Sequence, residues 1–260
     1  MNFVIVTQGD LLYTPVFFSE FFSSSCKGSC KGIIVQEALG NKSYPALIKR
    51  MYSFYGLFYF LKQGFNFCFK KIQAKLYEKS ISSKVISISN VAGHYGIPTL
   101  PCESVNTNEF KQWIKDNNID LIISIAASEV FGKEILELPT YGCINFHNAP
   151  LPNYRGMLPN FWQMYHDEDY SVLTVHTMTE DLDRGKIIYQ QKTKIKAEYS
   201  LEDLIFVTKR KSADVLARIL KQFDEHNIEY KVMPEETGSY FTFPGREDVR
   251  EFRSKGKRLL

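Results

Sequence analysis

The stretch "CINFHNAPLPNYRG", residues 143 to 156, places two polar side chains in an otherwise apolar strand. Side chains two positions apart in a strand point to the same face, so Asn145 and His147 share one face and Ile144 and Phe146 the other. The strand ends at "NAPLP", and ligands of open α/β sheets bind at the carboxyl ends of strands. The pair is therefore either a ligand-facing amide and imidazole or a buried, hydrogen-bonded pair.

The flanking sequence alternates apolar runs of strand length with longer amphipathic stretches. The predicted strands are 3–7, 32–36, 121–125, 143–147, 172–178 and 186–195. The predicted helices are 106–118, capped by Asn106 or Thr107, a short one at 159–166, and a long one from Leu201 with the capping-box pair Ser200 and Asp203. This alternation predicts an α/β fold with a doubly wound, mostly parallel sheet.

Two regions extend this α/β pattern. Residues 40–84 form an insertion that includes the aromatic, lysine-flanked run "MYSFYGLFYFLKQGFNFCFKK" at 51–71. It predicts one or two extra helices packed on the sheet edge, or an interfacial segment that contacts a membrane or a partner. We divide the chain into a main domain, 1–230, and a short C-terminal extension, 231–260. The basic tail of that extension predicts a solvated or partly docked helix, with phosphate or nucleic-acid contact as the alternative.

The composition is that of a globular protein. The chain has 260 residues, 44% hydrophobic and 23% charged. Its net charge of +3 does not by itself imply a nucleic-acid partner, and we expect none. The five cysteines lack the spacing of a metal site, so we expect reduced thiols, no metal and a cytoplasmic location. The start "MNFVIVTQGD" is typical of a first strand rather than a signal peptide, and no apolar run is long enough to span a membrane.

A second polar motif, "TEDLDRGKII" at 179–188, supplies carboxylates. Asp183 can approach Asn145 across the sheet edge, and Gly185 permits a backbone conformation that other residues resist. An amide, an imidazole and a carboxylate at one point suit acyl transfer, because they can hold an oxyanion and move a proton. No Ser or Cys lies in a Gly-x-Ser-x-Gly setting, which favours direct transfer. We expect the nearby His176 to be a core or rim histidine rather than a catalytic residue.

"INFHNAPLPNYRG" followed by "EDLDRG" resembles the N10-formyltetrahydrofolate-dependent formyltransferases, which include glycinamide ribonucleotide, methionyl-tRNA and sugar-amine enzymes. The matching positions are Asn145, His147, Leu151, Pro152, Tyr154, Arg155, Gly156, Leu182, Asp183 and Gly185. The stretch 120–145 also resembles the strand and pterin-side loop that precede this motif in the family. The likeness covers about residues 85–195.

The resemblance implies a Rossmann-like formyltransferase fold and N10-formyltetrahydrofolate as formyl donor. The implied catalytic residues are Asn145, His147 and Asp183. The implied pterin-binding residues are Ser128, Glu129, Val130, Phe131, Thr179, Glu180, Asp181 and Leu182. We expect the acceptor to be bound by Gln8, Tyr154, Arg155 and Gly156, the last three of which match the family's motif.

The acceptor is expected to be a small-molecule primary amine. "TQGDLLYTP" stands where a glycine-rich phosphate turn would suit glycinamide ribonucleotide, and the short segment after the last long helix differs from the barrel domain of the tRNA enzymes. Asn148 and Ala149 replace the family's common Pro-Ser. We therefore expect a nucleotide-linked amino sugar. The alternatives are an amino acid, peptide, ribonucleotide or tRNA-linked amine, or a catalytically silent folate- or nucleotide-binding module.

Overall fold

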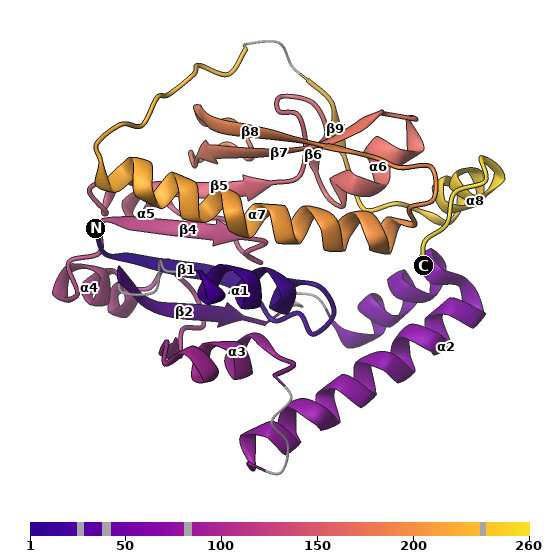
Figure 1. The fold of residues 1–260 in the computed structure, drawn as a ribbon, viewed down its shortest axis with the longest axis horizontal. Helices are drawn as coiled ribbons and strands as arrows, with labels where there is room; N and C mark the ends of the chain where they lie inside the picture. The colour runs from indigo at the N-terminus through magenta and orange to yellow at the C-terminus, as the bar shows by residue number, and fades with distance from the viewer. Residues whose placement is uncertain (25–28, 38–42, 81–84, 235–237) are drawn as a thin grey trace.

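The computed structural model describes residues 1–24, 29–37, 43–80, 85–234 and 238–260. Its centre is a seven-stranded sheet in the order β3-β2-β1-β4-β5-β7-β8 (Figure 1). The strands are β1 (Phe3–Gln8), β2 (Cys30–Gln36), β3 (Thr99–Leu100), β4 (Leu121–Ile125), β5 (Cys143–His147), β7 (Tyr170–Thr177) and β8 (Ile187–Lys194). The first five run parallel, and β7 pairs antiparallel with both β5 and β8. The predicted doubly wound, mostly parallel sheet is confirmed.

Helices cover both faces of this sheet. They are α1 (Thr14–Ser23), α2 (Tyr44–Glu78), α3 (Ile88–Tyr95), α4 (Asn108–Asp116), α5 (Lys133–Glu137), α6 (Pro159–Tyr165), α7 (Leu201–Asp224) and α8 (Arg246–Ser254). The α7 capping box is confirmed, because Ser200 and Asp203 each accept a hydrogen bond from the other's backbone N–H. Of the two candidate caps for α4, Thr107 accepts the hydrogen bond from the Phe110 backbone N–H.

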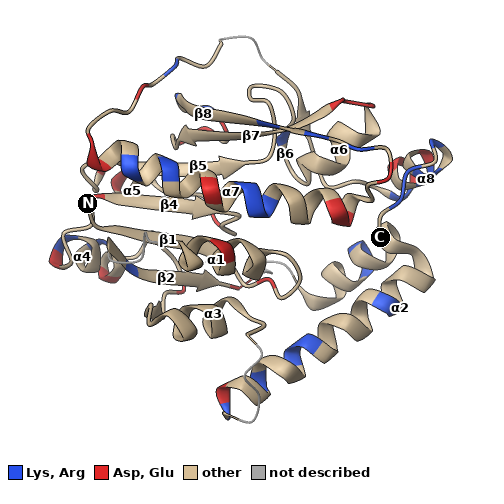
Figure 2. Cartoon of the chain, viewed as in Figure 1, with Lys and Arg blue, Asp and Glu red and all other residues tan. Residues whose placement is uncertain are grey.

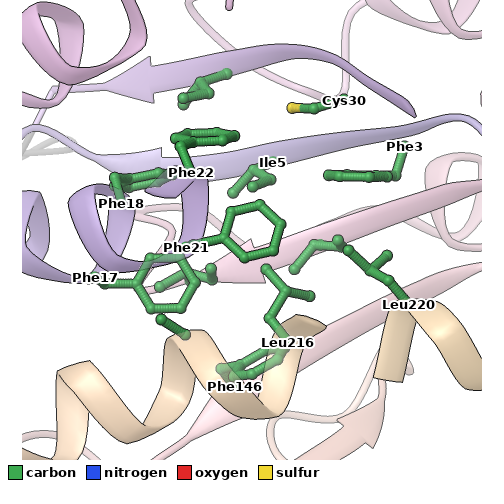
Figure 3. Close-up of a cluster of buried hydrophobic side chains, with 14 of the residues drawn as sticks. Phe3, Ile5, Phe17, Phe18, Phe21, Phe22, Cys30, Phe146, Leu216 and Leu220 are labelled. Atoms are coloured by element: carbon green, nitrogen blue, oxygen red, sulfur yellow. The ribbon is translucent and has the colours of Figure 1, made fainter. Parts of the chain in front are cut away.

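The main core lies between the sheet and helices α1, α3 and α7. Phe17 and Phe21 of α1 stack with ring centroids 6.1 Å apart, and Phe146 of β5 packs against Phe17 (Figure 3). Ile144 is buried in the same cluster, as the period of the strand predicted. The opposite face is covered by α4 and α5, so Asn145 and His147 project from β5 on that second side of the sheet.

The aromatic insertion is largely α2, which extends away from the body of the molecule (Figure 1). The helix is interrupted at Gly56, whose φ of +70° and ψ of 169° are not helical. It contacts α3 and α8, so the predicted extra helix is present. The ends of the predicted insertion, 40–42 and 81–84, lie outside the described residues, as does Cys26. Within the described part of the chain, no helix is both long and apolar enough to cross a bilayer.

The C-terminal segment folds back onto the main body. Its strand β9 (Tyr240–Phe241) pairs with β6 (Arg155–Gly156) in a second, two-stranded sheet. Phe252 of α8 is fully buried, with its ring centroid 4.6 Å from that of Phe161. The Leu201 N–H also donates to the Arg258 carbonyl at 2.8 Å. The tail therefore forms a docked helix and covers a third apolar cluster beside the β5–β6 turn.

Candidate active site

The site lies where β5 and β7 pair. Asn145 stands directly opposite His176, and His147 stands opposite Thr174. Directly opposite side chains of an antiparallel pair share a face. The amide and both imidazoles therefore project on the same side of the sheet, opposite the main core.

Asp183 reaches this face from the loop that joins β7 to β8. The loop lies so close to β7 that a Cβ on Gly185 would stand 1.7 Å from the Thr177 carbonyl oxygen. Glycine is thus required for space, and not, as the sequence suggested, for an unusual backbone conformation. Asp183 itself has a φ of +54°, a region that aspartate tolerates better than most residues.

One carboxylate oxygen faces both imidazoles. Asp183 Oδ1 lies 3.6 Å from His147 Nδ1 and 3.7 Å from His176 Nε2. The other oxygen, Oδ2, accepts the Gly156 backbone N–H at 3.2 Å. The structure therefore brings together the three residues that the resemblance implied, and adds His176 to them.

Carbonyl partners fix which ring nitrogens carry hydrogen. His147 Nε2 lies 3.0 Å from the Tyr154 carbonyl oxygen, and His176 Nδ1 lies 2.8 Å from that of Thr177. A carbonyl can only accept, so each of these nitrogens is a donor. His147 Nδ1 and His176 Nε2 are the two nitrogens that face the site.

His176 orients the Asn145 amide. Burial lowers the pKa of His176 to about 4, so the ring is neutral at pH 7 and its Nε2 is an acceptor. Asn145 Nδ2 donates to this nitrogen at 3.3 Å. Because an amide nitrogen carries two N–H donors, the second can serve a substrate oxygen. The sequence did not indicate this contact, since nothing in it shows that β7 runs antiparallel beside β5.

The loop 128–131, predicted to hold a pterin ring, is tied to the end of β2. The Ser128 N–H and hydroxyl donate to Gln36 Oε1 at 3.0 and 3.2 Å. The Glu129 carboxylate accepts the Val105 N–H at 2.7 Å and also contacts the Gln36 amide. The Gln36 and Glu129 side chains thus shape the loop. The only sequence signal for Gln36 is its place at the end of a predicted strand.

The remaining residues of the two predicted pterin loops differ in exposure. Phe131 is buried in the second core cluster and anchors its loop. Val130 is 55% exposed, and Leu182 of the other loop is 57% exposed. Thr179 donates its hydroxyl hydrogen to the Asp181 carbonyl at 3.0 Å, which closes the turn of residues 179–182. Glu180 and Asp181 are exposed.

The residues predicted to bind the acceptor have different surroundings. Gln8 ends β1, and its backbone N–H donates to the Ala126 carbonyl at 3.2 Å. The Tyr154 ring stacks on Phe241, and its hydroxyl donates to Glu168 at 2.7 Å, so this side chain supports the turn. Arg155 and Gly156 form β6, which presents the Gly156 N–H to Asp183.

Two surface cavities are lined by residues that are not among the predicted site residues. One, of about 520 Å³, borders α4 and includes Cys102, Phe110 and Trp113. The other, of about 580 Å³, lies between α2 and α8 and includes Phe54, Arg246 and Arg250. Among the described residues, no three His, Cys, Asp or Glu side chains are grouped so that they could hold a metal ion.

Comparison with known proteins identifies one family. Residues 69–220 match the family described as formyl transferase. The methionyl-tRNA formyltransferase of Clostridium acetobutylicum is 31% identical over 152 residues, which cover 58% of this chain and 48% of that protein. The enzyme of the same name from Citrifermentans bemidjiense is 35% identical over 130 residues, covering 50% and 41%. The chain spans about half the length of the curated relatives it matches.

Solved structures share the fold over more of the chain. Glycinamide ribonucleotide transformylase 1 from Symbiobacterium toebii superposes with a TM-score of 0.59 at 13% identity, covering 90% of this chain and 94% of that one. An N-formyltransferase from Helicobacter canadensis, solved with folinic acid and dTDP-3-aminofucose, gives 0.56 at 14% identity, covering 95% and 72%. At these identities the likeness shows the fold alone.

Proposed function

Because the chain belongs to the formyl transferase family, we propose that it transfers a formyl group from N10-formyltetrahydrofolate to a primary amine. The observation that carries this proposal is the convergence of Asn145, His147 and Asp183 at one edge of the sheet. These are the residue types that formyl transfer between two nitrogens requires: donors for an oxyanion and an acceptor for a proton.

In the proposed reaction the neutral amine attacks the formyl carbon, and the carbonyl oxygen becomes an oxyanion. The second N–H of Asn145 donates to this oxygen, and a protonated His147 adds positive charge beside it. One well-placed oxyanion donor typically stabilises a transition state by about 3 kcal/mol. His176 is neutral at pH 7, so it positions Asn145 and supplies no charge.

Asp183 handles the proton. Formation of the new C–N bond leaves an ammonium, whose proton passes to Asp183 directly or through a water molecule. The tetrahedral intermediate then loses its bond to N10, and the folate nitrogen takes up one proton as it leaves. The Gly156 N–H, which donates to Asp183 Oδ2, leaves Oδ1 directed toward the imidazoles.

The two exposed apolar side chains on the loops support a folate donor. Val130 and Leu182 each expose more than half of their surface. A flat heterocycle such as a pterin is bound by apolar side chains against its faces and backbone groups at its edge. We propose that loops 128–131 and 179–182 form this site, with Glu129 shaping the first loop rather than contacting the ring.

We further propose a nucleotide-linked amino sugar as acceptor, formylated in the cytoplasm. Sugar N-formyltransferases are among the proteins with this fold. The Asp10 carboxylate accepts the N–H groups of Leu12 and Thr14, at 2.7 and 2.8 Å, so it occupies the amides at the start of α1 that a ribonucleotide phosphate could use. The second candidate acceptor is methionyl-tRNA, which the names of the sequence relatives favour.

The donor is tested by calorimetric titration with 5-formyltetrahydrofolate, a stable analogue. We expect micromolar binding by the wild type and weaker binding by Ser128→Trp, which places bulk in the loop. Asn145→Ala, His147→Ala and Asp183→Asn should each lower turnover by about 10²–10⁴-fold while folate binding and circular dichroism are retained. Absence of folate binding by the wild type, or near-normal turnover in one of these variants, would contradict the proposal.

The acceptor is tested with the same donor against two panels. One contains dTDP- and UDP-linked amino sugars, and the other contains charged methionyl-tRNA. Formylation of a sugar nucleotide alone supports the proposed acceptor. Formylation of methionyl-tRNA alone assigns the chain to the second candidate.

A further inference from the structure

The second part of α2 carries an apolar stripe on its outward face. Beyond the break at Gly56, the stripe consists of Phe58, Leu61, Phe65, Phe69 and Ile72. Successive members are three or four positions apart, which places them on one side of a helix. Each is between 50% and 76% exposed, and the rings of Phe65 and Phe69 stack in parallel. We call these five residues the α2 stripe.

Beyond Gly56 the buried residues of the helix are Gln63 and Ala74, and the side that faces the protein makes polar contacts with it. Gln63 is buried and donates its amide hydrogen to Glu202 Oε1 at 3.2 Å. Lys70 donates to the carbonyl oxygens of Leu11 and Leu12 at 3.2 and 3.4 Å. A surface helix of a globular protein normally buries its apolar side and exposes its polar side. In this segment the large apolar side chains of the α2 stripe are exposed instead, so the stripe is not needed to attach the helix to the protein.

The helix is also strongly basic. Its charged residues are Lys49, Arg50, Lys62, Lys70, Lys71, Lys75 and, as its single carboxylate, Glu78 at the last position. Figure 2 shows Lys and Arg along α2, with acidic colour only at its end. An exposed row of Phe and Leu on a helix rich in lysine is typical of segments that lie in the surface plane of a membrane.

We propose that residues 57–78 dock on a membrane surface that contains anionic lipid. The α2 stripe enters the boundary between headgroups and acyl chains, and Lys62 and Lys71, both exposed, contact the lipid phosphates. Docking on a membrane is the interfacial alternative given above for residues 51–71, and it does not depend on formyl transfer.

Charge distinguishes a membrane from a second copy of the chain. Two α2 stripes packed against each other would bring two basic helices together, with no carboxylate between residues 44 and 77 of either to offset the repulsion. An anionic lipid surface supplies that complement along the whole helix.

The test is flotation of the full chain with vesicles of phosphatidylcholine alone and of phosphatidylcholine mixed with phosphatidylglycerol. We expect the wild type to float with the anionic vesicles and to release from them as salt is raised. The variant Phe65→Ser with Phe69→Ser should lose about tenfold or more in vesicle affinity, and Lys62→Glu with Lys71→Glu should lose preference for anionic lipid.

Val232→Ser is the matched control, because Val232 is 78% exposed and lies outside α2. Size-exclusion chromatography and circular dichroism confirm that each variant is folded. The proposal is overturned if the wild type floats with neither vesicle, if both double variants float as it does, or if neutral vesicles bind as well as anionic ones. It is also overturned if the wild type forms a dimer that Phe65→Ser with Phe69→Ser dissociates while no vesicle binding occurs, which assigns the stripe to a second copy.

Discussion

At the scale of single residues, the position of the Asn145 amide depends on His176. Replacing His176 by Leu removes the acceptor for the amide N–H and leaves Asn145 free to rotate away from the position of the proposed oxyanion. We expect kcat to fall about tenfold, the equivalent of one lost hydrogen bond, with little change in the KM for the proposed folate donor. His176→Gln retains an acceptor and should recover most of the loss. The measurement is steady-state kinetics of the two variants beside the wild type.

The Gln variant separates positioning from a purely structural role. A buried Leu and a buried Gln both alter the packing of β7, but only Gln can accept from Asn145. Equal kcat values for the two variants would therefore show that His176 does not act through Asn145. A rise in KM at unchanged kcat would assign His176 to donor binding instead.

His176 also makes stability depend on pH. Its pKa is lowered by burial from 6.5 to about 4, so between these values the unfolded chain binds more protons than the folded chain. The contribution is constant above pH 6.5, and stability should fall as the pH drops from 6.5 to 4, by up to about 3 kcal/mol. Urea unfolding at pH 7 and pH 4.5 measures this. If His176→Gln loses as much stability as the wild type over that range, another group is responsible.

The sequence predicts some of these residues better than others. The strand period alone places Asn145 and His147 on one face, and the structure agrees. The sequence shows only that Asp183 can reach Asn145. Whether it does so depends on the path of the loop beside β7, which no local pattern predicts. His176 was expected to be a core or rim residue, since no local pattern shows that its strand partner carries Asn145.

At the scale of elements, the loop that carries Asp183 depends on Gly185. Its missing side chain lets the loop lie against Thr177, where a Cβ would overlap the carbonyl oxygen. Gly185→Ala should lower the free energy of unfolding by about 1–3 kcal/mol and reduce kcat, because the loop must move and take Asp183 with it. Thermal unfolding and steady-state kinetics measure the two effects.

Gly93→Ala is the matched control. Gly93 lies inside α3, and a Cβ there would meet no atom within 4 Å. Alanine favours a helix over glycine, so this change should raise the free energy of unfolding by up to about 1 kcal/mol. If Gly185→Ala also left stability and kcat unchanged, the close approach at Thr177 would not constrain the loop.

Capping residues in the sequence predicted where helices start, but no sequence pattern predicted what each side of a helix contacts. The capping residues of α4 and α7 appear in the sequence and act as caps in the structure. The aromatic density of 51–71 predicted a helix, yet periodicity cannot say which side of it meets the protein. That the polar side of α2 faces inward could be learned only from contacts such as Gln63 with Glu202.

At the scale of the whole molecule, alternation of strands and helices was enough to predict the sheet, but not the return of the tail. The pairing of β6 with β9 joins two residues on each side, separated by more than eighty positions. Strands of two residues carry no periodic signal. The stacking of Tyr154 on Phe241 at this pairing therefore could not be anticipated, although it supports the turn that contacts Asp183.

This arrangement predicts that the C-terminal helix and the turn that contacts Asp183 unfold together. Phe252 and Phe161 are fully buried against each other. Phe241 packs against the same apolar cluster and stacks on Trp162. Phe252→Ala should lower the free energy of unfolding by about 3–5 kcal/mol, whereas Val232→Ala, at an exposed position, should change it by less than about 0.5 kcal/mol. Urea titrations of both variants, followed by circular dichroism and by formyl transfer, measure these changes.

For Phe252→Ala the two probes should give coincident transitions, displaced together to lower urea. The reason is that the third cluster is shared by α6, α7 and α8, so loosening one helix exposes the others. A first transition that abolishes formyl transfer while the signal of the sheet persists would instead show that residues 238–260 form a separate unit. In that case Asp183 would depend on the tail only through the short β6–β9 pairing.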